Sequence, residues 1–324
     1  MNKPMISRLL SGGLLITIAG AAAWVCGDYR RDMHPARERV SSGSRVAQTA
    51  HGPVEYAEIG DGSPVLVAHA AGGGFDQGLL FARFLGGDFH YIVPSRFGYL
   101  RSSVPDEASA QMQADVYASL LDTLKVDRVA VMGVSAGGPS ALQFALRHSD
   151  RCRALVMVSA ASCNDVPPRT KRGELPFRLM ESDFVFWAVE SALRSQLLSF
   201  FGLSKEVQAS LTPEQMRRMG TVIDTMLPMS QRVRGMRFDM DVMYSDLERY
   251  PIDRISAPAL VVHAKDDHFV RYSHREYTAK RIPGARLFAP ERGGHLFAAI
   301  DGEAQAEIRA FLTHHASSES LPSK

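Results

Sequence analysis

Residues 129–138 read VAVMGVSAGG, and this stretch decides the fold. An apolar run over 129–132 is followed by the pentapeptide Gly133-Val-Ser135-Ala-Gly137, which has the pattern G-x-S-x-G, and then by a helical pattern from Pro139. A tight turn from strand to helix, with glycines on both sides of a serine, exposes the serine hydroxyl. The first N–H groups of the helix then face negative charge that develops beside it. The stretch therefore predicts a nucleophile at Ser135.

Outward from this turn, short apolar runs alternate with segments of helical periodicity. We expect strands over 54–59, 64–69, 90–93, 128–132, 154–159, 259–263 and 286–288. We expect helices over 111–124, 139–147, 273–282 and 303–314. This alternation predicts an α/β fold in which a mostly parallel central sheet is covered by helices on both faces.

The alternation stops between residues 162 and 258, where the segments are helical and rich in Phe and Met. We expect a helical cap over 162–252, inserted into a core formed by 51–161 and 253–316. Its large apolar residues fit the wall of an apolar acyl pocket, although such residues at helical spacing more often form an ordinary core. These residues are Phe177, Phe184, Phe186, Trp187, Phe200, Phe201, Met226, Met229, Met236, Met240 and Met243.

The two ends of the chain differ in character from this core. Residues 9–26, LLSGGLLITIAGAAAWVC, carry no charge and have about the minimum length that spans a bilayer as a helix. We expect residues 1–31 to form a membrane anchor or a cleaved export signal, which implies a membrane-anchored or exported, periplasmic protein. Residues 32–50 lack periodicity and are expected to form a linker, and the polar tail over 317–324 is expected to be disordered.

Composition excludes several classes of function. The 324 residues carry a formal net charge of +2 and no basic stripe, so no nucleic-acid partner is expected. Three cysteines give no disulfide framework: Cys152 and Cys163 are expected to be separate apolar residues, with a pair between them as the alternative. No cluster of His and Cys predicts a metal site.

A serine hydroxyl needs a base that accepts its proton, and on this fold the acid and the histidine follow the serine in that order. Asp266 and Asp267 come directly after the predicted strand over 259–263. His295 follows Gly293 and Gly294 in a loop before the last helix. Both positions lie at the edge where a parallel sheet binds its ligands. His295 is the predicted base, and either aspartate fits the acid.

Two other histidines lie near these positions. His263 ends the strand and is expected to be packed in the core, whereas His268 is expected to be a neighbour of the site.

These motifs, in this order, resemble the α/β-hydrolase superfamily in the branch that carries a helical cap. The resemblance covers about residues 52–315 and includes two further loops: 69–74 (HAAGGG) resembles the oxyanion loop of the family, and 96–102 (RFGYLRS) resembles its arginine–glycine–serine loop. It implies that Asp267 is the acid, three residues before Val270. Asp165 is the alternative, since it follows the preceding strand, where some relatives carry the acid.

The resemblance also implies how charge and substrate are held. It assigns the backbone N–H groups of Ala136 and of Ala70 or Ala71 to an oxyanion hole, and it implies no cofactor and no metal. Three positions depart from the family pattern: Ala70 and Leu100 replace glycines, and Ser95 replaces an aspartate. A backbone donor does not depend on its side chain, so the oxyanion hole tolerates Ala70. The loop over 95–102 is expected to have an unusual shape.

The sequence thus predicts a serine hydrolase that cleaves the carboxylic ester of a hydrophobic small molecule through an acyl-enzyme on Ser135. Two alternatives stay open at this point. The same triad serves amide or C–C hydrolysis, acyl transfer and perhydrolysis. A ligand receptor on a hydrolase fold, with little turnover, also fits.

Overall fold

The computed structural model describes residues 3–165, 178–245, 247–297 and 301–316, the side chains of residues 3–19 and 316 excepted. Eight strands form one mixed sheet in the order β1-β2-β4-β3-β5-β6-β7-β8. The pairs β1·β2 and β2·β4 are antiparallel, and all other neighbours are parallel. The strands are β1 (Arg45–Thr49), β2 (Gly52–Ile59), β3 (Ser63–Ala68), β4 (Phe89–Pro94), β5 (Val129–Val134), β6 (Cys152–Val158), β7 (Ala259–Val262) and β8 (Arg286–Phe288).

Helices cover both faces of the sheet because successive side chains of a strand point to opposite sides. On one face, Leu66 of β3 and Val131 of β5 join a core with α3 (Ala110–Thr123) and α4 (Gly138–Arg147). On the other face, their neighbours in sequence pack against α2 (Phe75–Leu85) and α11 (Gly302–Ala316). α10 (Tyr272–Arg281) lies between β7 and β8 in the chain. The expected α/β fold, with helices on both faces, is confirmed.

The expected strands and helices are present within a few residues of their predicted ends. β2 and β3, which match the strands expected over 54–59 and 64–69, follow each other across Gly60–Gly62. They do not pair with each other, because β4 lies between them. β1 and α2 were not expected.

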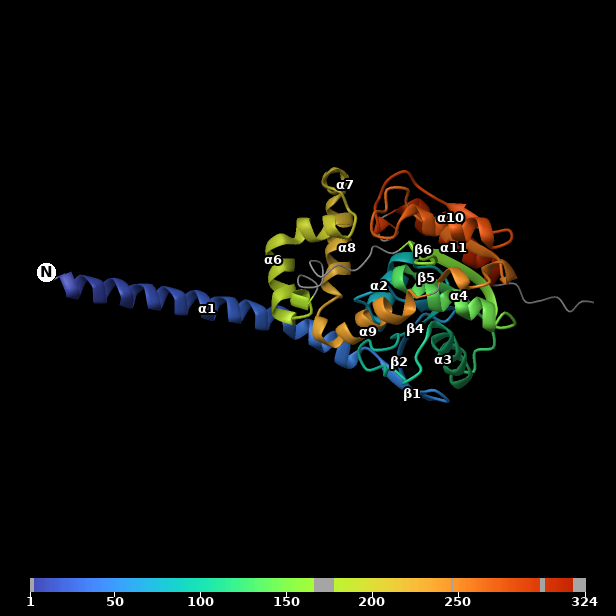
Figure 1. The fold of residues 1–324 in the computed structure, drawn as a ribbon, viewed down its shortest axis with the longest axis horizontal. Coiled ribbons are helices and arrows are strands. Elements are labelled where there is room, and N and C mark those ends of the chain that lie inside the picture. The colour runs from blue at the N-terminus through green and yellow to red at the C-terminus, as the bar shows by residue number, and fades with distance from the viewer. Residues whose placement is uncertain (1–2, 166–177, 246, 298–300, 317–324) are drawn as a thin grey trace, which may run out of the picture.

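The described residues between β6 and β7 are helical and contain no strand (Figure 1). A third apolar core lies there, built mainly from α6 and α8. The elements of this cap are α6 (Asp183–Phe200), α7 (Lys205–Ser210), α8 (Pro213–Asp224), η2 (Met229–Gln231), α9 (Val233–Phe238), η3 (Asp239–Met243), η4 (Leu247–Arg249) and η5 (Ile252–Arg254).

The segment expected to be a linker, residues 32–50, is structured instead. α1 (Lys3–Ser42) continues through its first part, and β1 pairs with β2 over its last part. Met33, Ala36 and Val40 are buried at spacings of three and four residues, so one stripe of the helix packs against the protein. The amino-terminal part of α1 extends away from the rest of the molecule (Figure 1). The arginines between these apolar positions hid the periodicity in the sequence.

Most of the apolar segment over 9–26 lies outside the residues whose side chains are described. Among the described residues, no helix is both long and apolar enough to cross a bilayer. The anchor or signal, and the location inferred from it, stay predictions. The tail over 317–324 lies outside the described residues. Cys152 and Cys163 are separate buried thiols, as expected.

Candidate active site

Ser135 lies immediately after β5, in a short 3-10 turn (η1, Ser135–Gly137) that leads into α4. Its φ is 51°, a left-handed conformation that is unfavourable for a residue with a side chain. Close packing holds the turn, since a Cβ atom on Gly137 would overlap the carbonyl oxygen of Ala68 in the neighbouring strand. The strain places the Ser135 side chain on the wall of a cavity, although only 4% of the residue is exposed.

The structure brings Ser135, His295 and Asp267 together in one hydrogen-bonded chain. His295 Nε2 lies 2.9 Å from Ser135 Oγ, and His295 Nδ1 lies 2.8 Å from Asp267 Oδ2. An ionised carboxylate only accepts, so Nδ1 of His295 carries the proton. Nε2 is then free to accept from the serine hydroxyl. This is the geometry in which a histidine can remove the proton of the serine.

Two backbone amides orient Asp267. The N–H groups of Phe269 and Val270 donate to its Oδ1, each at 2.9 Å, and its Oδ2 faces His295. Burial alone would raise the pKa of Asp267. Attraction to the neighbouring His295 and hydrogen bonds from His263 and His295 outweigh burial and hold that pKa well below its usual range. Asp267 is therefore ionised at every pH at which the protein would work.

The other two aspartates have different partners. Asp266 accepts from the backbone N–H groups of Gly293 and Gly294, at 3.1 and 2.8 Å, and so holds the loop that carries His295. Asp165 is ion-paired with Arg271 at 2.8 Å. The structure thus places Asp267, and not Asp266 or Asp165, against His295.

The loop before His295 is held by a backbone contact with the cap. Gly294 has a φ of 64°, and a Cβ atom there would overlap the carbonyl oxygen of Gly202, just after α6. Only glycine tolerates both this conformation and this approach. On the other side, the ring of Phe269 lies 5.0 Å from the ring of His295. The predicted base is therefore enclosed by the cap and by the acid loop.

The loop after β3 adjoins Ser135, because β3 and β5 pair in parallel up to Ala68 and Gly133. Ala70 and Ala71 line the same cavity as Ser135, and Ala136 directly follows the serine at the start of η1. The amide positions expected to form an oxyanion hole therefore flank the serine, and their role remains a prediction.

His69 fixes the start of this loop. Its Nδ1 donates to the carbonyl of Ala70 at 2.8 Å, and its Nε2 accepts from the backbone N–H of Arg96 at 2.9 Å. Burial and the nearby Arg96 charge hold the pKa of His69 well below its usual value, so the ring is neutral. A neutral ring with both nitrogens engaged is a structural support and has no free proton to exchange.

In the loop over 95–102, two of the three positions that depart from the family pattern make specific contacts; that its shape is unusual for the family stays a prediction. Leu100, at a position where the family has glycine, takes a left-handed φ of 51° and donates its N–H to the carbonyl of Gln231 in the cap at 2.8 Å. Ser95 donates to Glu55 at 2.9 Å and accepts from the N–H of Phe75. This loop therefore joins the sheet to the cap.

Two buried ion pairs attach the cap to the core. Arg96 donates to both carboxylate oxygens of Asp239, at 2.5 and 2.7 Å. Arg232 and Arg39 both contact Asp76, each with a nitrogen 2.8 Å from its Oδ2. Arg39 lies on α1 and Asp76 in the first turn of α2. Burial alone would raise the pKa of Asp76, but the charges and hydrogen bonds of both arginines lower it.

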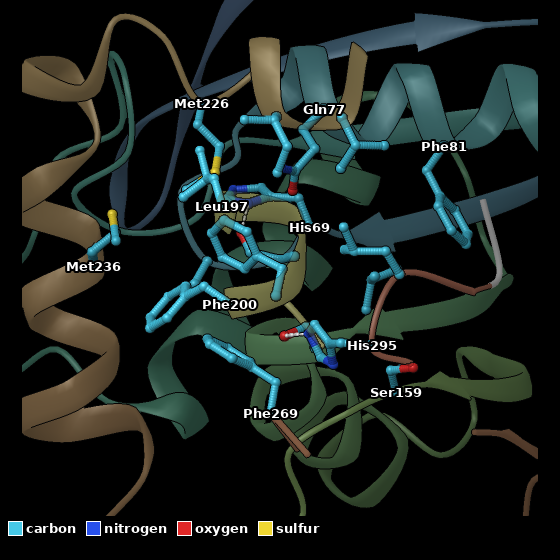
Figure 2. Close-up of a pocket in the computed structure, with 18 of the residues that line it drawn as sticks. His69, Gln77, Phe81, Ser159, Leu197, Phe200, Met226, Met236, Phe269 and His295 are labelled. Carbon is cyan, nitrogen blue, oxygen red and sulfur yellow. Dashed lines mark hydrogen bonds between the residues drawn. The ribbon is translucent and has the colours of Figure 1, made fainter. Parts of the chain in front are cut away.

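The cavity beside Ser135 has a volume of about 740 Å³. Figure 2 shows His295 at its base, with Phe200 and Phe269 beside it and Met226 and Leu197 above. Seven of the expected cap residues line it: Phe186, Phe200, Phe201, Met226, Met229, Met236 and Met240.

The other expected cap residues lie elsewhere. Phe184 is exposed, Trp187 and Met243 are buried in cores, and Phe177 lies outside the described residues. Phe81 and Phe84 of α2 line the wall and were not expected, because α2 itself was not predicted.

The polar lining residues among those described are His69, Gln77, Ser135, Ser159, Gln196 and His295, and none is Lys, Arg, Asp or Glu. The cavity therefore suits an uncharged, apolar group of the size of a drug or fatty acyl chain. In the described part of the chain, no three His, Cys, Asp or Glu side chains gather as metal ligands would.

Comparison with known proteins agrees with this fold. A family model described as the alpha/beta hydrolase fold matches residues 63–299. The hydrolase YcgS of Bacillus subtilis is 28% identical over 255 residues, which are 76% of this chain and 89% of that protein. The 2-hydroxy-6-oxo-6-phenylhexa-2,4-dienoate hydrolase of Comamonas testosteroni is 23% identical over 75% of this chain and 84% of its own. The solved alpha/beta hydrolase fold protein from Nakamurella multipartita is 30% identical, with a TM-score of 0.68 over 85% of this chain and 100% of that chain.

Proposed function

The chain belongs to the α/β-hydrolase fold family, and from this premise we propose that it is a serine hydrolase of hydrophobic carboxylic esters. One observation carries the proposal: the hydrogen-bonded chain of Ser135, His295 and Asp267 ends on an apolar cavity of about 740 Å³. The ester carbonyl binds beside Ser135, and its apolar part fills the cavity.

The reaction follows from the proton positions in this chain. Ser135 Oγ attacks the acyl carbon while its proton moves to Nε2 of His295. Asp267 stabilises the imidazolium that forms, and the N–H groups of Ala136 and of Ala70 or Ala71 hold the negative oxygen. The alcohol leaves with the proton from His295. Water, deprotonated by the same nitrogen, then attacks the acyl-enzyme and releases the acid.

The cavity wall favours a neutral ester over the substrate class of the dienoate hydrolase. The name of that relative describes a substrate that is a carboxylate. A buried carboxylate is stabilised most strongly by a cationic partner, and the described lining residues include no Lys or Arg. An alkyl or aryl acyl group can be buried against the same residues without the desolvation cost of a charged group. The apolar lining therefore supports a neutral substrate, such as an ester with an alkyl or aryl acyl group.

A fluorophosphonate probe tests the proposed chemistry on the full chain, because it reacts with serines that a neighbouring base activates. We expect one label per chain, located at Ser135 by peptide mapping. Ser135→Ala removes the nucleophile and should lower ester hydrolysis by about 10⁵- to 10⁶-fold. His295→Ala should abolish labelling, and Asp165→Asn serves as the control that keeps it. Folded wild-type protein that stays unlabelled would contradict the proposal and favour a ligand receptor.

Acyl chain length tests the use of the cavity. In a series of p-nitrophenyl esters, kcat/KM should rise by about three- to fourfold for each added methylene until the cavity is full. A preference for short or charged acyl groups would contradict an apolar acyl site.

A further inference from the structure

A second histidine contacts the acid of the predicted triad. His263 directly follows β7 and is 1% exposed. Its Nε2 lies 3.1 Å from Oδ2 of Asp267 and 2.9 Å from the carbonyl oxygen of Val270. The same Oδ2 lies 2.8 Å from Nδ1 of His295. Two imidazoles therefore share one carboxylate oxygen.

The proton on His263 can be assigned from its surroundings. Both neighbours of Nε2, the carboxylate and the carbonyl, are hydrogen-bond acceptors, so Nε2 carries a proton and donates. Its single N–H is shared between the Val270 carbonyl at 2.9 Å and Oδ2 of Asp267 at 3.1 Å. Asp267 therefore accepts from Phe269 and Val270 at Oδ1, and at Oδ2 from His295 and, in part, from His263.

The backbone on both sides fixes the His263 ring. The N–H of His263 donates to the carbonyl of Phe288 at 3.0 Å, and Arg275 donates to the carbonyl of His263 at 3.3 Å. The charged and titratable groups that face His263 are Asp267 and His295 in the site, and His274 and Arg275 on α10. Asp267 is the carboxylate that His263 contacts, at 3.1 Å, while the Arg275 guanidinium lies over the ring of Tyr272.

We propose that His263 is a positioning residue of the active site, which shares the Oδ2 atom of Asp267 with His295 and limits how strongly that carboxylate stabilises the charged form of His295. The inference rests on the proposed serine-hydrolase function. His263 acts through Asp267 and touches neither the serine nor the cavity. It also ties the two ends of the acid loop together through Val270.

The consequence is a defined change in pH dependence. When His263 no longer donates, more of the charge on Asp267 is available to His295, and the imidazolium persists to higher pH. The base is active only when neutral, so the acidic limb of the pH–rate profile moves upward. A residue that only fills space would leave this limb unchanged.

The test compares three replacements of His263 in the full chain. Gln places an amide N–H near the position of Nε2 and so keeps the donor. Leu fills similar space without a donor. Asn is a second variant without that donor, because its amide is too short to reach Asp267. The second-order rate of Ser135 labelling by a fluorophosphonate probe is measured between about pH 5 and 9.

We expect His263→Leu to move the acidic limb upward by about half a pH unit and to lower the maximal rate by about tenfold. His263→Asn should behave in the same way, and His263→Gln should keep both close to wild type. His274→Leu is the matched control, because His274 is also buried but accepts from the N–H groups of Ser162 and Cys163. It should lower the melting temperature without moving the limb.

Three outcomes would overturn the inference. The first is that the pH–rate profiles of His263→Leu and His263→Asn coincide with that of the wild type. The second is that His263→Gln does not keep the wild-type profile. The third is that His274→Leu moves the acidic limb as far as His263→Leu does. If the Leu variant does not fold, Asn against Gln decides. Wild-type protein that never labels would instead remove the proposed function itself, which keeps the two failures distinct.

Discussion

Asp267 and Asp76 are both buried carboxylates whose pKa lies below the usual value, yet their partners differ. Asp267 faces two imidazoles, those of His295 and His263. Asp76 faces two guanidinium groups, those of Arg232 and Arg39. An imidazole gains and loses its proton near neutral pH, whereas a guanidinium does not. The same carboxylate chemistry therefore allows proton exchange in one place and a permanent attachment in the other.

The two clusters also join different parts of the chain. Asp267 connects the ends of β7 and of the loop before α11, both within the sheet domain. Asp76 connects α2 to the cap through Arg232 and to α1 through Arg39. Loss of Asp267 should therefore affect the reaction, and loss of Asp76 should affect the assembly of the fold.

The largest effect is expected at Asp267. In Asp267→Asn the side chain no longer selects the histidine tautomer with a free Nε2, so ester hydrolysis should fall by about 10⁴-fold. Some loss of thermal stability should accompany it, because the amide replaces an ionised carboxylate that faces N–H groups at both oxygens, so activity is compared on variant protein that is still folded at the assay temperature. Asp266→Asn is the control: it weakens two backbone contacts of the histidine loop and should reduce activity far less. A larger loss in Asp266→Asn would contradict the choice of Asp267.

The next effect is expected in the free energy of unfolding, at Asp76. Asp76→Asn leaves Arg232, which is fully buried, without an anion, and should lower that free energy at pH 7 by about 3 kcal/mol. The folded-state pKa of Asp76 is lowered, so its contribution is present above the unfolded value of about 3.9 and is lost as the pH falls through the folded value. Urea unfolding should show a constant difference between pH 5 and 8 and a smaller one only in strong acid. A constant difference at all pH values would contradict this.

A smaller effect on the free energy of unfolding is expected at Arg39, which joins α1 to α2 and to the cap. Arg39 is partly exposed and contacts Asp76 together with the carbonyls of Asp224 and Leu227. Arg39→Met should lower the free energy of unfolding by about 2 kcal/mol, measured in urea. The exposed Arg37 is the matched control, and Arg37→Met should change it by less than about 0.5 kcal/mol. Equal effects of the two changes would contradict the docking of α1 through Arg39.

The sheet domain was largely predictable because its signals are local. The turn over 133–137 has glycine two residues before and two residues after Ser135, and the central strands β5 and β7 are continuous apolar runs. His295 and Asp267 follow predicted strands, and parallel strands bring their carboxyl ends to one edge. Resemblance to the family was still needed to choose Asp267 over Asp266, because both are acidic and adjacent. Spatial contact with His295 now separates them.

The cap side was less predictable because its contacts join residues far apart in sequence. Arg39 and Asp76 are 37 residues apart, and Asp76 and Arg232 are 156 apart. Nothing in the local sequence marks a surface-like arginine as buried against a distant carboxylate. α2 was missed for a related reason: it begins just after three glycines that read as loop, and only packing against the sheet shows it to be a helix. The role of His263 likewise appears only when its distance to Asp267 is known.

The contact between Gly202 and Gly294 couples the cap rigidly to the loop that carries His295, the proposed general base. A side chain between two segments can accommodate a small displacement by changing rotamer. Two glycines in backbone contact have no side chain that could do so, and a displacement of one segment is passed on to the other. We expect an ester too bulky for the cavity to push the end of α6 and, with it, the ring of His295 away from Ser135. The turnover rate would then depend on substrate size, because esters that fit the cavity poorly would bind but react slowly. Selectivity among acyl groups should accordingly appear in kcat more than in KM.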